Sequence, residues 1–282
     1  MRGSEIADCV DCRPFRNPKW STMNLLFVAD IMGRPGRRAA AVLIPQLRKV
    51  YGVCLCIVNG ENAAGGAGIT EKIAQELYAC GVDVITTGNH VWDQKEAVPY
   101  IQRATRLLRP ANYPPEVGGI GSGMFETAEG GLVGVINLQG RTFMGALDCP
   151  FRVAEREIEK LGTKVTVVDF HAEATSEKMA MGWYLDGRVS AVIGTHVHVQ
   201  TADERILPKG TAYITDVGMT GPHDSVIGVE CEVALKRFLT QMPVKFTPAK
   251  VNVKLCGVVL EVDEETGRAR RIQRLRVDYN GA

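Results

Sequence analysis

The side chains best suited to chemistry in this sequence are imidazoles, carboxylates and amides at the ends of apolar, strand-like segments. Four of the five histidines are in such places, together with acidic and amide residues. The candidates are His90, His171, His196 and His198, with Asp30, Glu61, Asn62 and Asn89. Mixed imidazole, carboxylate and amide-oxygen ligands suit divalent metals such as Mn, Fe and Zn. The sequence therefore predicts a metal site built from several strand ends.

The number of candidates favours two metal ions. Without His90 there are seven, more than one ion needs, whereas two ions that share a carboxylate would use them all and leave positions for water and substrate. Paired ions of this kind lie roughly 3.5–4 Å apart and lower the pKa of a bridging water toward about 7. We expect the bridging hydroxide to attack phosphorus in a phosphate ester.

The elements that must position these residues alternate between apolar strands and helices. Strand patterns at Asn24–Asp30, Val53–Asn59 and Val82–Thr87 are separated by helical patterns at Arg37–Val50 and Thr70–Cys80. Such alternation predicts an α/β fold with a largely parallel sheet, whose ligands bind beyond the carboxyl ends of the strands. Further strands are expected near Met124–Thr127, Leu132–Leu138, Lys164–Phe170, Val189–Gly194 and Thr211–Thr215, helices at Gln94–Gln102, Arg152–Leu161 and Val229–Thr240, and a closing hairpin at Val251–Asp263 and Ala269–Val277.

Taken in order, the candidate residues resemble the site of the calcineurin-like metallophosphoesterases, and more closely that of their bacterial YmdB-like branch. The resemblance runs from about Met23 to the C-terminus. Its motifs are Asn-Gly-Glu-Asn-Ala at 59–63, Thr-Gly-Asn-His at 87–90, Asn-Leu-Gln-Gly-Arg at 137–141, Asp-Phe-His-Ala-Glu-Ala-Thr-Ser at 169–176, Gly-Thr-His-Val-His at 194–198 and Thr-Asp-Val-Gly-Met-Thr-Gly at 215–221. Two departures from the wider superfamily are shared with that branch: Met32 replaces a histidine, and Glu61 replaces a bridging aspartate.

The resemblance implies a four-layer α/β/β/α sandwich with a dinuclear centre. It assigns Asp30, Glu61, Asn62 and His198 to one metal and Glu61, Asn89, His171 and His196 to the other, with Glu61 as the bridge. Because Asn62 would replace the missing imidazole, the first site is rich in oxygen, which favours iron or manganese over zinc. The resemblance also implies phosphodiesterase activity on 2′,3′-cyclic nucleotides, with 3′,5′-cyclic nucleotides as a second candidate class, and a homo-oligomer.

His90 is surplus to the metal ligands and is the candidate proton donor to the leaving ribose oxygen. Asp93 could orient the His90 imidazole. It could instead be the N-cap of a helix that starts at Gln94, with Glu96 completing a capping box, and this is the favoured interpretation. The remaining candidates are substrate contacts: Arg141, in a Gly-Arg-Thr loop, and His223, for which a role in a surface turn is favoured.

Composition restricts the class of protein. The 282 residues are 45% hydrophobic, enough for a sizeable core, and carry a formal charge of +1, which excludes the strongly basic surface of an extended nucleic-acid or membrane site. No segment has the length of a transmembrane span or the apolar core of a secretory signal, so we expect a cytoplasmic protein without disulfides. Met1–Thr22, which contains the Cys9-x-x-Cys12 pair, is interpreted as a disordered extension, and 23–282 as one domain.

Two other functions stay open at this point. A phosphomonoesterase or nucleotidase would use the same metal geometry. A regulatory protein could use the metal fold to bind RNA or a protein partner, with weak hydrolysis. The near-zero net charge and the surplus His90 favour catalysis over binding alone.

Overall fold

The computed structural model describes residues 22–281, which form two β-sheets, six α-helices and one short 3-10 turn. The strands are β1 Thr22–Val28, β2 Asp30–Ile31, β3 Leu55–Asn59, β4 Val84–Thr86, β5 Leu107–Leu108, β6 Ser122–Glu126, β7 Leu132–Gln139, β8 Val165–His171, β9 Ala191–Thr195, β10 Arg205–Ile206, β11 Ala212–Ile214, β12 Met219–Pro222, β13 Val253–Asp263 and β14 Ala269–Asp278. The helices are α1 Gly33–Tyr51, α2 Glu71–Ala79, α3 Val98–Arg103, α4 Pro150–Leu161, α5 Thr175–Leu185 and α6 Cys231–Thr240.

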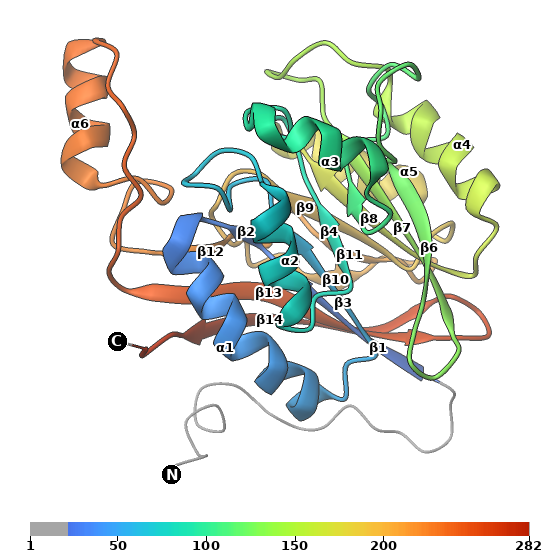
Figure 1. Cartoon of the computed structure of the whole chain (residues 1–282). Coiled ribbons are helices and arrows are strands. Elements are labelled where there is room, and N and C mark those ends of the chain that lie inside the picture. The colour runs from blue at the N-terminus through green and yellow to red at the C-terminus, as the bar shows by residue number, and fades with distance from the viewer. Residues whose placement is uncertain (1–21, 282) are drawn as a thin grey trace.

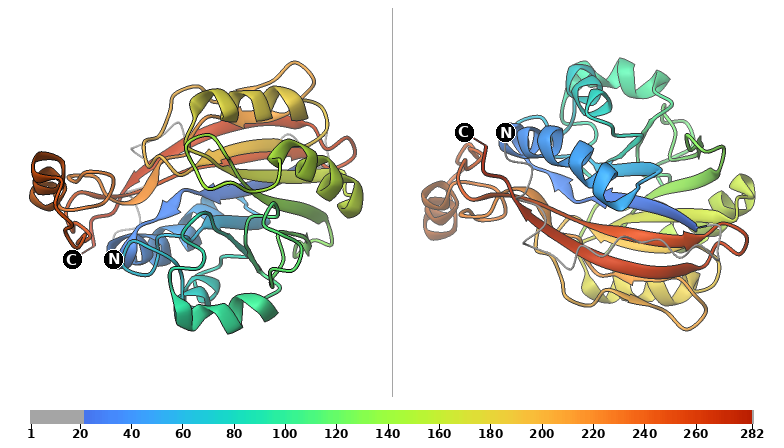
Figure 2. Two further views of the ribbon diagram at one scale, coloured as in Figure 1. Left: turned by 90° about the horizontal axis from the view of Figure 1, so that it is seen from above. Right: turned by 90° about the horizontal axis from the view of Figure 1, so that it is seen from below.

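The two sheets lie face to face with helices on both outer sides (Figures 1 and 2). One sheet has the order β2-β12-β13-β1-β3-β4-β5, with β14 also paired to β13, and the other has the order β10-β11-β9-β8-β7-β6. Helices α1, α2 and α3 cover the first sheet, and α4 and α5 cover the second. This arrangement confirms the predicted α/β/β/α sandwich.

Alternation along the strands divides their apolar side chains between inner and outer cores. Leu25 and Phe27 of β1 pack between the sheets with Val135 and Val167 of the second sheet. Leu26, which points the other way, packs in the core beneath the helices of the first sheet. Since strand side chains alternate between faces, one apolar run supplies two cores.

Near the carboxyl ends of the central strands, the inward-facing positions change from apolar to polar. These buried polar residues are Asn59 on β3, Thr86 on β4, Asn137 on β7, Asp169 on β8 and Thr195 on β9. The inner core therefore ends in a polar layer, directly beneath the loops that carry the predicted ligands.

Several predicted boundaries are wrong. The helix predicted at Arg37–Val50 begins earlier, at Gly33, and a Cβ on Gly36 in its first turn would lie 2.2 Å from the Thr220 carbonyl oxygen. The predicted helix Gln94–Gln102 is a 3-10 turn, Lys95–Ala97, followed by α3. Pro99 is in the first turn of α3, where a backbone N–H would have no acceptor within the helix, so proline costs no hydrogen bond there. Helix α5 and the short strands β2, β5, β10 and β12 were not predicted.

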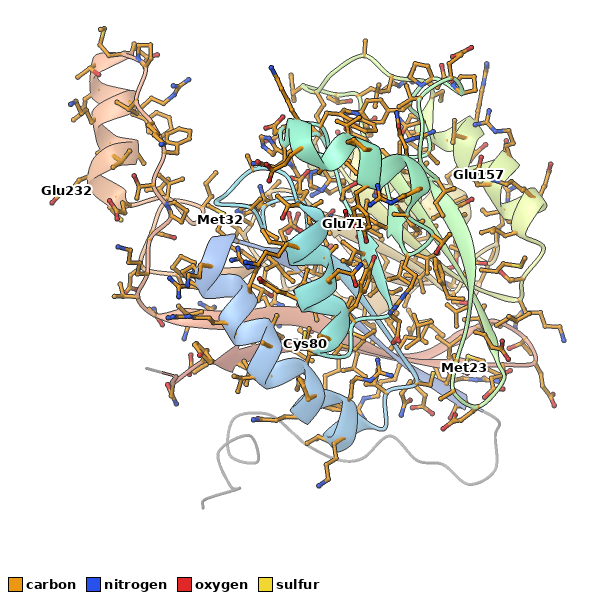
Figure 3. The ribbon with its side chains drawn as sticks, viewed as in Figure 1. Met23, Met32, Glu71, Cys80, Glu157 and Glu232 are labelled. Carbon is orange, nitrogen blue, oxygen red and sulfur yellow. The ribbon has the colours of Figure 1, made fainter. Side chains whose placement is uncertain are left out.

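Helix α6 projects from the body of the molecule as an arm (Figure 1). At its base, Met32 and Ala234 belong to a small apolar cluster, and Figure 3 shows Met32 beside the body and Glu232 out on the arm. Farther along, the side chains of Phe238 and Leu239 are 71% and 82% exposed. No helix among the described residues is long and apolar enough to cross a membrane.

The six described cysteines are free. Cys9 and Cys12 lie outside the described residues. So does the predicted extension Met1–Thr22, apart from Thr22, which begins β1.

Candidate metal centre

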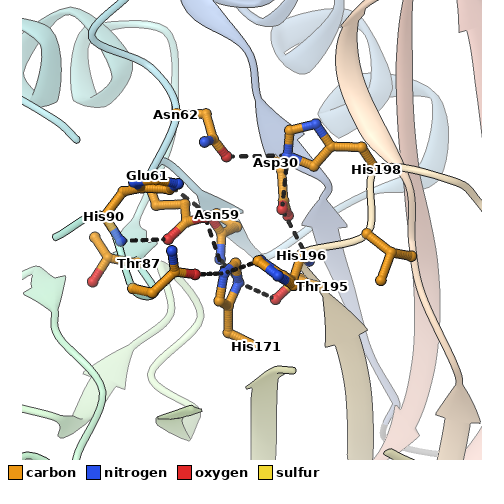
Figure 4. Close-up of polar contacts among 12 residues, drawn as sticks. Asp30, Asn59, Glu61, Asn62, Thr87, His90, His171, Thr195, His196 and His198 are labelled. Atoms are coloured by element: carbon orange, nitrogen blue, oxygen red, sulfur yellow. Dashed lines mark hydrogen bonds and ion pairs between the residues drawn. The ribbon is translucent and has the colours of Figure 1, made fainter. Parts of the chain in front are cut away.

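The predicted ligands converge above the polar layer, at the carboxyl ends of strands from both sheets (Figure 4). The first sheet contributes the residues that follow β1, β3 and β4, and the second contributes the end of β8 and the turn after β9. Their contacts divide them into two adjoining groups.

The first group contains Asp30, Asn62 and His198. The Nε2 atom of His198 lies 3.2 Å from Asn62 Oδ1 and 3.5 Å from Asp30 Oδ2. Asp30 Oδ2 also accepts a hydrogen bond from the His196 N–H (3.0 Å). The other oxygen, Asp30 Oδ1, is buried and has no hydrogen-bond partner among residues 22–281. A buried carboxylate oxygen without a partner is costly unless it binds a cation.

The second group contains Glu61, Asn89, His171 and His196. His171 Nε2 lies 2.9 Å from Glu61 Oε1, 3.2 Å from Asn89 Oδ1 and 3.0 Å from His196 Nδ1. The donor atoms of Glu61, His171 and His196 all lie within 4.8 Å of one another. Three donor atoms this close can share one metal ion.

The three imidazoles in these groups each make a hydrogen bond or an ion-pair contact through the nitrogen that faces away from the centre. The partners are Thr195 Oγ1 for His171 (2.9 Å), Glu173 Oε2 for His196 (3.0 Å) and the Ile227 carbonyl for His198 (2.9 Å). Such bonds fix the tautomer of a ligand histidine and leave its other nitrogen free for a metal. Of these partners, none was predicted, although Thr195 and Glu173 stand one and two residues from a predicted ligand histidine.

Behind His171, the bond to Thr195 continues into a buried carboxylate. The Thr195 hydroxyl donates to Asp169 Oδ1 (2.7 Å), and Asp169 Oδ2 accepts from Asn59 Nδ2 (3.0 Å) and from the Thr86 hydroxyl. Asn59 and Thr86 belong to the first sheet, whereas Asp169 and Thr195 belong to the second. The network therefore joins the two sheets and aligns the His171 ring from below.

Thr195→Val should weaken metal binding about 10- to 100-fold, since an aligning partner of a ligand histidine contributes roughly that much. The valine has a similar shape but cannot bond to His171, while Asp169 keeps its two partners from the first sheet. Thr195→Ser, which retains the hydroxyl, is the matched control and should bind metal like the wild type. Competition with a chelator measures both affinities. Equal affinities in the two variants would show that the hydroxyl has no aligning role.

Charge and burial set the protonation of the donor atoms. Burial, with the nearby charge of His171, lowers the pKa of His196 to about 3, and burial also lowers the pKa of His198. Burial opposes ionisation of Glu61, but the charge and hydrogen bond of His171 outweigh it and hold the Glu61 pKa at about 2. Burial likewise opposes the charge on His171, yet Glu61 and Asp30 raise its pKa to about 9. His196 and His198 are therefore neutral beside the ionised Glu61, and His171 would release its proton when a divalent cation binds, as metal binding to a protonated ligand requires.

The turn that carries His196 and His198 is strained and firmly held. Both residues have positive φ angles, 101° and 63°, which are uncommon for residues other than glycine. Between them, the Val197 N–H donates to Asp216 Oδ2 (3.1 Å), and that oxygen also binds the buried ammonium of Lys178 (2.7 Å). Strained backbone that is held in this way is common at functional sites.

His90 stands apart from the two groups. Its backbone N–H donates to Glu61 Oε2 (3.2 Å), but its side chain, 37% exposed, faces Asp93, with 2.7 Å between His90 Nδ1 and Asp93 Oδ2. The favoured interpretation of Asp93 as a helix cap is wrong: the 3-10 turn starts after Gln94 and has no side-chain cap. The Asp93 carboxylate is bound to the imidazole instead, which leaves His90 Nε2 for a substrate.

Asp93→Ala should slow hydrolysis of a nucleotide substrate about 10- to 100-fold, a part of the roughly 10²–10⁴ that a general acid contributes, because the His90 ring loses its orientation. Metal content should not change. Glu96→Ala is the matched control and should have no effect, since Glu96 completes no capping box. A comparable loss in both variants would indicate a structural role for this segment.

The two candidate substrate contacts lie in different surroundings. Arg141 is exposed in the loop after β7, where its backbone N–H donates to the Glu177 carboxylate (3.1 Å). His223 lies at the end of β12, where its Nδ1 is 3.0 Å from the Gly221 carbonyl. It lines a cavity of about 190 Å³ with His198. Arg141 therefore stands at the rim of the site, next to the strand of His171, and His223 stands behind His198.

Comparison with known proteins places the chain in a family. It is 51% identical to the 2′,3′-cyclic-nucleotide 2′-phosphodiesterase of Bacillus subtilis, over 91% of this chain and 97% of that protein. The crystal structure of a hypothetical protein from Thermus thermophilus matches with a TM-score of 0.84 and 44% identity, over 91% of this chain and 99% of that one. The crystal structure of a phosphatase from Mycoplasma pneumoniae matches with a TM-score of 0.87 and 36% identity, over 92% and 94%. The sequence model of the YmdB-like proteins matches residues 26–275, and the chain belongs to this family, which is of the metallophosphoesterase type.

Proposed function

We propose that this protein is a phosphodiesterase that uses two divalent metal ions to hydrolyse cyclic nucleotides. The observation that carries the proposal is that His171 and His196 gather beside Glu61, and His198 beside the Asp30 carboxylate, whose Oδ1 is buried without a partner among the described residues. Buried acidic and imidazole groups arranged in this way are typical of a metal site.

The two groups of side chains would divide the ligands between two metals in the way that the family resemblance implies. Asp30, Asn62 and His198 would hold one ion, Asn89, His171 and His196 the other, and Glu61 would bridge them. Iron or manganese is preferred and zinc is a further candidate, because the first group is rich in oxygen. When bound, the two ions would acidify a water molecule and neutralise charge on the phosphoryl oxygens.

The protein's own groups complete the reaction. His90, oriented by Asp93, would donate a proton to the leaving ribose oxygen as the phosphorus–oxygen bond breaks. Arg141, at the rim, would bind the phosphate. The turn that holds His196 and His198 is fixed before substrate arrives, so little reorganisation is needed during the reaction.

The name of the Bacillus subtilis relative supports 2′,3′-cyclic nucleotides as substrates, with cleavage of the bond to the 2′ oxygen and release of a nucleoside 3′-phosphate. Hydrolysis of 3′,5′-cyclic nucleotides is a second proposal, which rests on the family resemblance alone.

A substrate screen with measured metal content tests the proposal. The manganese- or iron-loaded protein should hydrolyse bis-p-nitrophenyl phosphate and 2′,3′-cyclic AMP, and p-nitrophenyl phosphate much more slowly. Faster hydrolysis of the monoester would favour a phosphomonoesterase. Inertness towards all three substrates with metals bound would favour a regulatory binding protein.

We also propose a homo-oligomer, as the family resemblance implies. The exposed Phe238 and Leu239 on the α6 arm support it, since a large apolar surface is costly to leave in water. Light scattering of the full chain measures the mass, and a monomer at micromolar concentration would contradict the proposal.

A further inference from the structure

We infer that Gln139 is a substrate-binding residue of this site and that its side-chain amide binds the ribose hydroxyl released by cleavage. The inference rests on the proposed function and names a contact for the leaving group. Gln139 is the last residue of β7, at the carboxyl edge of the second sheet.

The direction of the Gln139 side chain follows from alternation along β7. Val135 packs in the core between the sheets, whereas Leu138 packs in the outer core beneath the helices. Asn137 faces inward like Val135, and its Oδ1 accepts a hydrogen bond from the Thr87 N–H of the opposite sheet (3.0 Å). Gln139, two residues further along, therefore also points between the sheets.

This direction brings Gln139 to the His90 side of the site. Gln139 is paired in register with His171 on β8, and His171 Nε2 lies 3.2 Å from Asn89 Oδ1. Because the preceding inward position faces Thr87, Gln139 faces the Gly-Asn-His segment that follows Thr87 and ends in His90. The leaving oxygen must lie near His90 to receive its proton.

The Gln139 side chain is buried without a partner. It is 2% exposed, and Oε1 makes no hydrogen bond with any residue among 22–281. Its backbone, in contrast, is fully bonded to the Asn112 side chain: the Gln139 N–H donates to Oδ1 (2.9 Å), and the Gln139 carbonyl accepts from Nδ2 (2.8 Å). A fixed backbone that carries an unpaired buried amide is a group prepared for a ligand.

The chemistry of the amide selects the ligand. An amide has an acceptor oxygen and a donor NH₂ group, and a hydroxyl both donates and accepts, so the two can pair through the buried oxygen. A phosphoryl oxygen can only accept, and would leave Oε1 unpaired. The ribose hydroxyl formed as the phosphorus–oxygen bond breaks is the donor that the product offers on this side.

The test compares two products that differ only in this hydroxyl, adenosine 3′-monophosphate and 2′-deoxyadenosine 3′-monophosphate. The metal-loaded wild type should bind the ribonucleotide about tenfold more tightly, as expected for one hydrogen bond to a buried group. Gln139→Leu should bind both products equally, within about twofold, at unchanged metal content. Its thermal midpoint should be equal or higher, because the substitution removes an unpaired buried polar group. Isothermal titration and calorimetric unfolding give these values.

Gln46→Leu, on the exposed side of α1, is the matched control and should retain the wild-type preference. A preference for the ribonucleotide that persists in Gln139→Leu would overturn the inference. So would a wild type that hydrolyses 2′,3′-cyclic AMP but binds both products equally. A wild type that binds neither product and hydrolyses no diester would overturn the proposed function, and this inference with it.

Discussion

Replacing Glu61 with alanine should lower the bound metal from two ions per chain to about one or fewer, and hydrolysis of every diester by at least about 10³-fold. The bridging carboxylate would bind both ions, and without it two cations roughly 4 Å apart repel each other without compensation. The hydrolysis rate falls this far because the metals supply several kcal/mol of transition-state stabilisation, which would be lost with them. Elemental analysis gives the stoichiometry.

Glu71→Ala is the matched control, because Glu71 is an exposed glutamate on α2 that pairs with Arg103 on the surface. It should retain both metals and full activity. Two ions retained in the Glu61 variant would contradict the bridging assignment. Gly88 packs directly against this carboxylate, since a Cβ on Gly88 would lie 2.3 Å from Glu61 Oε2.

His90→Ala should keep both metals and lose about 10²–10⁴ in rate on 2′,3′-cyclic AMP, as expected for a general acid. The loss should depend on the leaving group. Since p-nitrophenolate departs without a proton, the same variant should hydrolyse bis-p-nitrophenyl phosphate at close to the wild-type rate. Steady-state rates on the two substrates, with metal content measured in parallel, provide the comparison.

Asn89→Ala and His196→Ala are the contrasting variants, because the loss of a metal ligand should slow both substrates alike and reduce the bound metal. If His90→Ala slows the two substrates equally while it retains metal, His90 binds the phosphate electrostatically and is not the acid. The His90–Asp93 contact supports the acid, since it engages Nδ1 of the imidazole and leaves Nε2 for the leaving group.

Local patterns were sufficient to predict the alternating strands and helices and the convergence of the ligand candidates, whereas the four layers were implied by the family resemblance alone. Apolar strands that end in Asp, Asn-Gly-Glu-Asn or Gly-Asn-His bring polar groups to one edge of the molecule. The partners behind the ligands depend on contacts between distant segments. Ile227, for example, binds His198 through its carbonyl group, which no side-chain pattern reveals.

Two errors have the same kind of cause. Helix α5 was not predicted because its buried side includes Lys178, whose ammonium is paired with Asp216 on a distant loop, and Gly182, which packs against Tyr213. A helix is predicted from a periodic pattern of apolar residues, and the buried lysine and glycine interrupt this pattern in α5. The spacing of Asp93 and Glu96 fits a capping box. In the structure, however, the Asp93 carboxylate contacts the His90 imidazole instead of capping a helix.

The place of β1 in its sheet affects when the site can form. Leu25 pairs with Leu55 of β3 on one side and with Leu260 of β13 on the other, and the Ala29 N–H, next to Asp30, donates to the Cys256 carbonyl (2.9 Å). The ribosome makes β13 more than two hundred residues after β1. Until then, the edge of β1 that pairs with β13 has no hydrogen-bonding partner. Pairing over such a separation is slow. Asp30 therefore reaches its final position only after β13 has been made, and metal uptake should follow the synthesis of β13.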